Sequence, residues 1–262
     1  MTASSSPSSA AALTSDQRED TLRRFRKHQA AWDRNSALRA LYQEWYERIR
    51  QALEGAAPGL HIEIGSGPGF ARTFIPELLL TDLVAAPWHD LEVDSNHLPY
   101  PDGELGAIVL LDVLHHLASP AGFFDEAIRA LAPGGRIVIC DPYIGPLSYL
   151  VYKFFHEEPF DLSVDAVNLD LDPAKDPFDS NQAIATLLFG RQRLKFEQRF
   201  PQLEIITTER MAGLSYPASG GFSRRPLLPE GAWKLLRAGE RRLPRFLNPW
   251  IGFRMFVVLQ RR

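Results

Sequence analysis

The sequence predicts an α/β protein with a mostly parallel sheet, and three observations lead to this fold class. Short apolar runs recur along the middle of the chain. Each run is followed by a loop or a helical pattern instead of a tight hairpin, and strands that alternate with helices form parallel sheets. The runs are also continuously apolar, as expected for strands that are buried on both faces.

Six segments carry this strand pattern. They are Leu60–Ile64, Leu78–Leu80, Ala107–Leu111, Arg136–Cys140, Leu203–Thr208 and Phe253–Leu259. The second, third and fourth of them lead into Asp82, Asp112 and Asp141. In doubly wound sheets, ligands bind outside the carboxyl ends of the strands, so functional residues are expected just after these runs.

Helical patterns precede and separate the strands. Large apolar side chains between Leu38 and Leu53 recur on one helix face. Ser119 followed by Pro120 is typical of an N-cap and a first helical residue, and this helix should run to about Leu131. Two further helices are expected over Asn181–Phe196 and Glu230–Leu243.

Composition suggests how the chain is divided. Residues 1–15 hold almost no large apolar side chains, which predicts a disordered tail. Residues 16–56 should form an N-terminal helical extension, and residues 57–262 the main domain. Within that domain, the Asp- and Pro-rich segment 157–180 is expected to be an irregular insertion over the sheet edge.

Residue counts exclude several classes of protein. The single cysteine, Cys140, rules out a disulfide framework and a multi-cysteine zinc site, and no metal ligands are predicted. No apolar run approaches the roughly 20 residues that span a bilayer. The first 17 residues carry no Lys or Arg, so a secretory signal with a basic segment is not expected. We therefore expect a cytoplasmic location.

A glycine cluster is the strongest local signal. Gly65, Gly67 and Gly69 follow a predicted strand directly, and glycine lets the backbone turn sharply and approach a ligand closely. A dinucleotide-binding fingerprint needs a third glycine three residues after the second, where this chain has Phe70. The Gly-Lys-Ser/Thr sequence of a P-loop is absent as well.

The pattern from Glu63 to Gly69 resembles the first motif of class I S-adenosylmethionine (SAM)-dependent methyltransferases, and it is closest to their type 11 branch. Further matches follow in order. They are Asp82 at the end of a strand, the segment Asp94–Gly103, the strand Ala107–Leu111 with its trailing histidines, and the turn at Leu131–Gly135. The resemblance covers about residues 59–143.

This resemblance implies a Rossmann-like, doubly wound, seven-stranded sheet, with a SAM-binding core at 59–143 and an acceptor-side region at 144–262. It places Asp82 on the ribose hydroxyls and Asp94 on the adenine amino group, although Asp94 could instead only form a turn. The chain departs from the family between Gly69 and Asp94, where both crossovers are too short for full helices. The cofactor residues that it implies are Glu63, Gly65, Ser66, Gly67, Gly69, Asp82, Asp94, Ser95 and Asp112.

The acceptor side is less defined. His115 and His116 follow the fourth strand of the motif, so they either assist deprotonation of the acceptor or bind backbone carbonyls. Tyr143, His156 and Glu157 are candidate pocket residues in an aromatic-rich region that suits a small-molecule or lipid acceptor. The alternative for the last two is an exposed helix end.

The resemblance therefore implies a SAM-dependent methyltransferase that acts on an oxygen or nitrogen, less readily a carbon, of a small molecule or lipid. The alternatives are an inactive SAM-binding scaffold or regulatory protein and, disfavoured by Phe70, a nicotinamide dehydrogenase.

Charge along the chain bears on the partners. Residues 59–185 hold 5 basic and 20 acidic residues, which argues against nucleic acid, whereas residues 186–262 hold 15 basic and 5 acidic ones. Lys234, Arg237 and Arg241 form a basic helix stripe that makes either a weak peripheral membrane contact or an ordinary surface.

Overall fold

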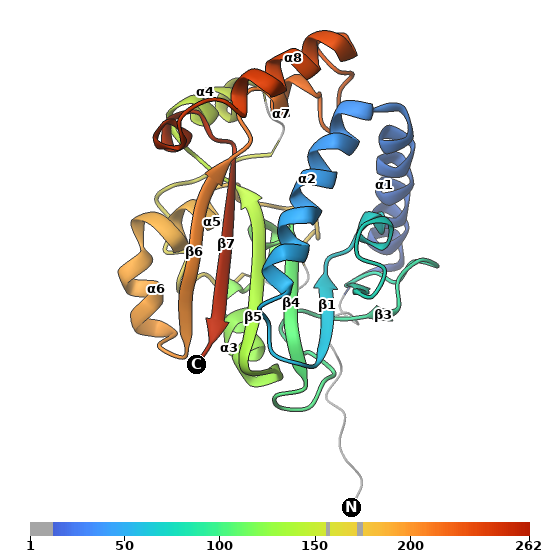
Figure 1. Ribbon diagram of the computed structural model, residues 1–262. Helices are drawn as coiled ribbons and strands as arrows, with labels where there is room; N and C mark the ends of the chain where they lie inside the picture. Colours follow the sequence, from blue (N-terminus) through green and yellow to red (C-terminus); the bar gives the residue numbers. More distant parts are fainter. Residues whose placement is uncertain (1–12, 156–157, 172–174) are drawn as a thin grey trace, which may run out of the picture.

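A seven-stranded sheet forms the centre of the protein, with strand order β3-β2-β1-β4-β5-β7-β6. The structure is a computed structural model that describes residues 13–155, 158–171 and 175–262 (Figure 1). The strands are β1 (Leu60–Ile64), β2 (Leu79–Asp82), β3 (Leu91–Glu92), β4 (Leu105–Leu111), β5 (Leu131–Pro142), β6 (Leu203–Met211) and β7 (Arg254–Arg261).

Neighbouring strands from β3 to β5 pair in parallel, and β7 is antiparallel to both β5 and β6. The Rossmann-like, doubly wound, mostly parallel sheet is therefore confirmed. All six predicted strands are present. The fourth begins earlier than expected, because the Pro-Gly-Gly turn after Leu131 lies inside β5 as an irregularity in its pairing with β4.

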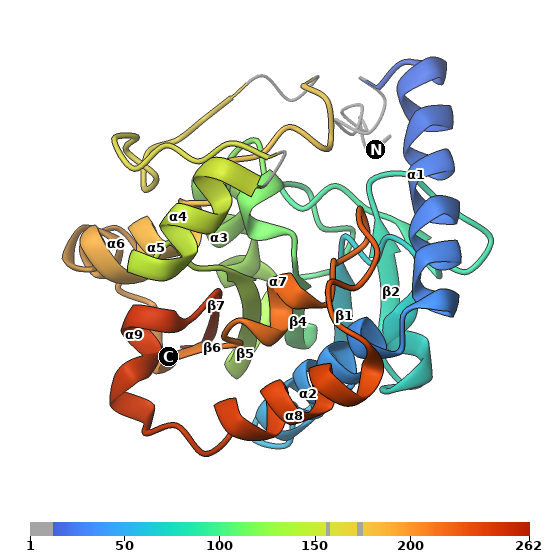
Figure 2. The ribbon, with the colours of Figure 1, turned by 90° about the horizontal axis from the view of Figure 1, so that it is seen from above.

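One face of the sheet is covered by α2 (Ser36–Leu53) and α8 (Glu230–Glu240), as the view from above shows (Figure 2). The apolar stripe of α2 is buried there, with Leu38, Leu41 and Ile49 fully covered. They pack with the side chains of β4 and β5 that point to this face, including Val109 and Val138. The predicted extension thus supplies part of the main core.

The opposite face is covered by α3 (Pro120–Ala130) and by the segment α5 (Ile184–Thr186), η4 (Leu187–Arg191) and α6 (Arg193–Arg199). Ser119 caps α3 as predicted, by accepting a hydrogen bond from the backbone N–H of Gly122. The helical stretch predicted over Asn181–Phe196 begins only at Ile184, and it is divided into these three pieces. The side chain of Gln192, at the break before α6, instead forms hydrogen bonds with the backbone of Val164 and Ala166 in the irregular segment.

The carboxyl edge of the sheet is bordered by shorter elements and by α1 (Ser15–Arg34). Thr14 and Gln17 form a capping box at the start of α1, and Leu13 before them is buried. The helix thus begins one residue before the predicted boundary, and the rest of the predicted tail, residues 1–12, lies outside the described residues. The other elements at this edge are η3 (Leu114–His116), α4 (Pro146–Phe155), α7 (Ser215–Ala218), η5 (Arg245–Leu247) and α9 (Asn248–Ile251).

Both early crossovers are as short as the residue counts indicate. Only the 3-10 turn η2 (Phe70–Thr73) lies between β1 and β2, and no helix lies between β2 and β3, where every residue is described. The edge of the sheet beside β3 is therefore open to α1, which packs across it. In the described parts of the chain, no helix combines the length and the apolar character needed to cross a membrane.

Candidate active site

A cavity of about 710 Å³ lies at the carboxyl edge of the sheet and joins the glycine loop to the histidine pair. Eight of the nine predicted cofactor residues line it. They are Glu63, Gly65, Ser66, Gly67, Asp82, Asp94, Ser95 and Asp112. The volume falls within the roughly 300–1,000 Å³ of small-molecule sites.

The glycine loop depends on backbone conformations that other residues rarely adopt. Gly65 has φ +65°, and a Cβ there would come within 2.6 Å of the Val113 side chain. Gly67 has φ +48° but no close neighbour, because a Cβ would lie 3.6 Å from Phe25. Gly69, the predicted residue that does not line the cavity, faces the Trp88 ring. Sterics fix the first and third glycines, whereas the second leaves space next to the cavity.

Asp82 holds this loop against the end of β2. Its Oδ2 accepts a hydrogen bond of 2.8 Å from the backbone N–H of Gly67, and its Oδ1 accepts one of 3.1 Å from Val84. Trp88 donates its indole N–H to the carbonyl oxygen of Gly67 at 2.7 Å. Asp82 is therefore a loop anchor, and a ribose would have to use the lone pairs that these bonds leave.

Glu63 lies beneath the loop with 2% of its surface exposed. Tyr46 of α2 donates its hydroxyl to Oε1 at 3.0 Å, and Oε2 is buried with no hydrogen-bond partner. Burial raises the pKa of Glu63 to about 7 against the hydrogen bonds that lower it. The site thus contains a buried carboxyl group with one unused oxygen.

Asp94 follows β3 and is buried. Its Oδ1 accepts a hydrogen bond from the backbone N–H of Asn96, and its Oδ2 lies 2.9 Å from Nδ1 of His97. Asp94 therefore forms a turn, which was the alternative interpretation. It also lines the cavity, as its implied contact with adenine requires. Ser95 lies beside it in the cavity wall.

Asp112, at the end of β4, has φ +61°, which is unusual for a residue with a side chain. Its Oδ2 accepts the hydroxyl of Tyr42 at 2.8 Å, and its Oδ1 forms an ion pair with Arg254. The Arg254 guanidinium lies between the Trp45 and Tyr216 rings, 4.8 Å and 4.6 Å from their centroids. These contacts connect the cavity floor to α2 and β7.

The helix α1 extends across the glycine-loop side of the cavity, which the sequence did not indicate. Gln29 donates its amide to the carbonyl oxygen of Pro68 in the glycine loop, and Arg18 forms two hydrogen bonds with Glu92 of β3. Phe25 and His28 line the cavity between these two contacts. No sequence motif marks them, because the contacts depend on how the helix lies across the loop.

His115, in η3, is buried between two carboxylates. Its Nδ1 lies 2.9 Å from Oδ1 of Asp141, and its Nε2 lies 3.5 Å from Oε2 of Glu158. Burial alone would lower the pKa of His115, but the charge of Asp141 and the hydrogen bonds to both carboxylates raise it to about 10.

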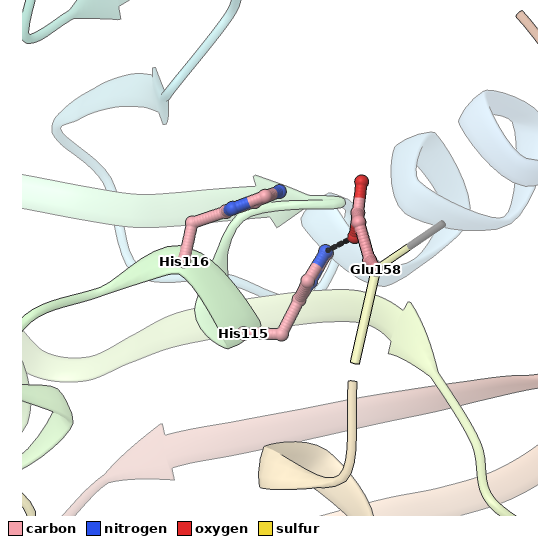
Figure 3. Close-up of side chains that lie close together, drawn as sticks. All are labelled: His115, His116 and Glu158. Carbon is pink, nitrogen blue, oxygen red and sulfur yellow. Dashed lines mark ion pairs between the residues drawn. The ribbon is translucent and has the colours of Figure 1, made fainter. Parts of the chain in front are cut away.

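His116 packs against His115, with ring centroids 4.1 Å apart. Its Nδ1 lies 3.4 Å from the carbonyl oxygen of Asp179. Burial and the neighbouring His115 lower its pKa to about 3. Figure 3 shows the pair with Glu158, and all three residues line the cavity.

None of the three predicted pocket residues is seen to line the main cavity in the described part of the chain. Tyr143 lies outside the main cavity and lines a second, shallower one, where its hydroxyl donates to the carbonyl oxygen of Pro249. His156 and Glu157 lie outside the described residues. Glu158, next to them, does line the main cavity. The apolar wall at this end is formed by Val151, Tyr152, Phe155, Leu214, Tyr216 and Phe253.

The predicted basic stripe of α8 is largely paired within the protein. Arg237 and Arg241 both form ion pairs with Glu44 of α2, and Lys234 pairs with Glu230 at 2.6 Å. Trp233 on the same helix is buried and donates its indole N–H to the carbonyl oxygen of Ser215. The stripe thus joins α8 to α2.

Residues 62–139 match the protein family described as a methyltransferase domain. This segment of the chain is a methyltransferase domain. The match contains β2, β3 and β4 and most of β1 and β5, and it includes every cofactor residue that the sequence implied.

Curated relatives match over a short stretch. The demethylmenaquinone methyltransferase of Tropheryma whipplei (strain Twist) is 41% identical over 47 residues, which is 18% of this chain and 20% of that protein. The enzyme of the same name from Clavibacter sepedonicus is 37% identical over 51 residues, or 20% and 21% of the two chains. The chain thus spans about a fifth of the length of these relatives.

Solved structures match more of the chain at low identity. A SAM-dependent methyltransferase from Archaeoglobus fulgidus has 12% identity and a TM-score of 0.47, covering 86% of this chain and 94% of its own. Geranyl diphosphate C-methyltransferase from Streptomyces coelicolor A3(2) has 14% identity and a TM-score of 0.43, covering 84% and 77%. The fold assignment rests on the strand order and pairing described above.

Proposed function

We propose that the protein transfers the methyl group of SAM to an oxygen or nitrogen atom of a small-molecule or lipid acceptor. The observation that carries the proposal is the continuous cavity, which joins the glycine loop of a methyltransferase domain to a histidine pair and an apolar wall. A cytoplasmic location remains part of the proposal on the sequence arguments above.

The cofactor end of the cavity suits a nucleoside with a charged tail. Asp94 and Ser95 offer acceptors and donors at the edge of β3, and Gly67 leaves free space beside the backbone. Glu63 has a buried carboxyl oxygen with no hydrogen-bond partner, and Asp112 lines the same cavity. Such acidic groups favour a ligand that carries a sulfonium and an ammonium group.

The acceptor end needs mainly to orient the reactants, because the sulfonium is already a strong electrophile. Transfer requires the acceptor atom in line with the methyl group at about 3–3.5 Å. The new bond forms to carbon as the C–S bond breaks, the acceptor loses its proton, and S-adenosylhomocysteine leaves. We assign the acceptance of that proton to His116, whose lowered pKa leaves its ring neutral at pH 7, and the orientation of His116 to the protonated His115 that packs against it; both line the cavity.

Calorimetry with S-adenosylhomocysteine tests the cofactor assignment. Asp94→Asn should weaken binding about 10- to 150-fold, because it removes a charged hydrogen-bond acceptor worth roughly 1.5–3 kcal/mol. Asp102→Asn is the matched control, since Asp102 is largely exposed and pairs with Arg129 outside the cavity. Equal affinity of the parent and the Asp94 variant would reject the adenine-side assignment.

Methyl transfer itself separates an enzyme from an inactive SAM-binding scaffold. The assay is incorporation of labelled methyl from SAM into a small-molecule and lipid extract. His116→Gln should lower this rate while the affinity for S-adenosylhomocysteine stays nearly unchanged. Tight cofactor binding without incorporation into any fraction would favour the scaffold, and full activity of His115→Gln, His116→Gln and the double variant would remove the pair from the mechanism.

A further inference from the structure

The cluster of His115, His116 and Glu158 has the composition of a metal site. The ligand atoms that these residues offer all lie within 4.8 Å of one another (Figure 3). Two imidazole nitrogens and one carboxylate oxygen form a set that binds first-row transition ions and leaves coordination positions open. We infer that this cluster binds a divalent transition metal ion of the zinc class, which departs from the absence of metal ligands expected from the sequence.

The hydrogen bonds of both rings leave Nε2 as the atom that can bind a cation. A carbonyl oxygen only accepts hydrogen bonds, so Nδ1 of His116 donates to Asp179 and Nε2 keeps its lone pair. In the same way, Nδ1 of His115 donates to the Asp141 carboxylate. A carboxylate behind a histidine is the usual outer-shell support of a metal ligand.

The gap between His115 and Glu158 also fits an ion. The two facing atoms are 3.5 Å apart, longer than the about 2.7–2.9 Å of a charge-assisted hydrogen bond. Two ligand atoms at 2.0–2.2 Å from a tetrahedral ion lie about 3.3–3.6 Å apart. In the metal-free protein the proton on Nε2 of His115 lies between these two atoms, and a metal ion that binds here displaces that proton. A small movement of the half-buried His116 ring completes the triangle.

The carboxylate of this cluster is itself held in place. Oε2 of Glu158 accepts a hydrogen bond of 3.1 Å from the Ser180 hydroxyl and another from the Gln182 amide. All three ligands line the cavity, so the open positions of the ion face the acceptor end. An oxygen or nitrogen atom of the acceptor can occupy one of them, and this last step rests on the proposed methyl transfer.

The experiment is a titration of untagged, chelator-treated protein with Co²⁺, followed by visible absorption in the absence of cofactor. One equivalent should bind with the bands of a nitrogen-containing site. Zn²⁺ should displace it, and millimolar Mg²⁺ should not, because Mg²⁺ prefers oxygen ligands. Equal displacement by Mg²⁺, or no saturable binding, would overturn the inference.

Variants locate the ion. His116→Gln and Glu158→Gln should each weaken Co²⁺ binding about 100-fold, and Asp141→Asn about 10- to 100-fold. Lys175→Met should strengthen it, because the Lys175 charge acts on His116. His61→Gln, at the opposite end of β1, should change nothing. Binding that survives both His116→Gln and Glu158→Gln would mean an adventitious ion only.

Failure of this inference is distinguishable from failure of the proposed function. Calorimetry with S-adenosylhomocysteine in excess chelator tests cofactor binding alone. Retained cofactor binding without Co²⁺ binding would leave methyl transfer in place and return the histidines to direct proton transfer. Circular dichroism of each variant confirms that a loss of metal affinity occurs in folded protein.

Discussion

Glu63 shows how a single buried carboxyl group links the cofactor site to stability. Its pKa rises from 4.5 to about 7 on folding, chiefly because burial disfavours the charged form. Between these two pH values the folded state binds more protons than the unfolded state. The free energy of unfolding therefore falls as the pH rises from about 4.5 to about 7, and above that range the loss is complete.

Glu63→Gln should remove this loss, since the amide stays neutral and its oxygen still accepts the Tyr46 hydroxyl. At pH 8 the variant should exceed the parent in unfolding free energy by roughly 2–4 kcal/mol, with little difference near pH 4.5. Urea unfolding without cofactor at the two pH values measures it. The exposed Glu77→Gln serves as control, and a pH-independent difference would contradict the assignment.

Residue patterns singled out most of the polar residues that line the glycine-loop end of the cavity, and fewer of those at the histidine end. The glycine loop and the acids at 63, 82, 94 and 112 could be found because backbone geometry and strand ends restrict which residues fit. Asp82 was expected on the ribose, yet its bonds to Gly67 and Val84 hold the loop. Glu158 belongs to the same titratable cluster as the candidates His156 and Glu157, but its contact with His115 could not be predicted, because η3 is distant in the sequence.

The helix α1 is the element that adds most to the site beyond what the sequence indicated. It contacts the glycine loop through Gln29 and β3 through Arg18, and Phe25 closes the space between them. A full crossover helix between β2 and β3 would occupy this edge in a longer sheet. The short crossover, visible in the sequence, is what allows α1 to lie across the glycine-loop end of the cavity.

Phe25→Ala should therefore weaken the binding of S-adenosylhomocysteine by speeding its dissociation. The phenyl ring is buried and lies 3.6 Å from the position that a Cβ on Gly67 would take, so its removal opens the cover. Stopped-flow measurement of the dissociation rate tests this. Arg23→Ala, on the exposed side of α1, is the control. An unchanged rate would show that α1 covers the site without retaining the ligand.

Helix periodicity predicted elements that pack on the sheet but not where a helix breaks. The stripe of α2 was clear because one face is wholly apolar. The three-part segment from Ile184 to Arg199 was predicted as one helix, since the bonds of Gln192 to Val164 and Ala166 are tertiary contacts. The local sequence pattern therefore indicates that a helix forms, whereas the positions of these breaks depend on contacts with residues distant in the sequence.

At the scale of the whole molecule, the uneven charge is largely compensated across helices. The basic last third supplies Arg237 and Arg241, and the N-terminal extension supplies Glu44 between them. The basic stripe of α8 would be able to contact an anionic membrane in an isolated helix, but part of it forms ion pairs within the protein. Net charge by segment indicates which parts attract each other, and only the packing shows that they meet.

Arg237→Glu should accordingly lower the unfolding free energy, because it places one new carboxylate against those of Glu44 and Glu240 in a half-buried contact. The parent protein should partition equally to neutral and anionic vesicles through this face. Thermal unfolding and vesicle co-sedimentation measure the two effects. Salt-sensitive binding to anionic vesicles that is lost in Lys234→Glu plus Arg237→Glu, with cofactor affinity retained, would instead support membrane contact.

The placement of Cys140 gives the natural protein a built-in reporter of unfolding. The only thiol of the chain lies in the interior strand β5 with 0% of its surface exposed, and burial raises its pKa. A thiol reagent can then modify the protein only when that strand opens. The labelling rate under native conditions measures this opening, and its slowing by a bound nucleoside would report affinity without any engineered probe.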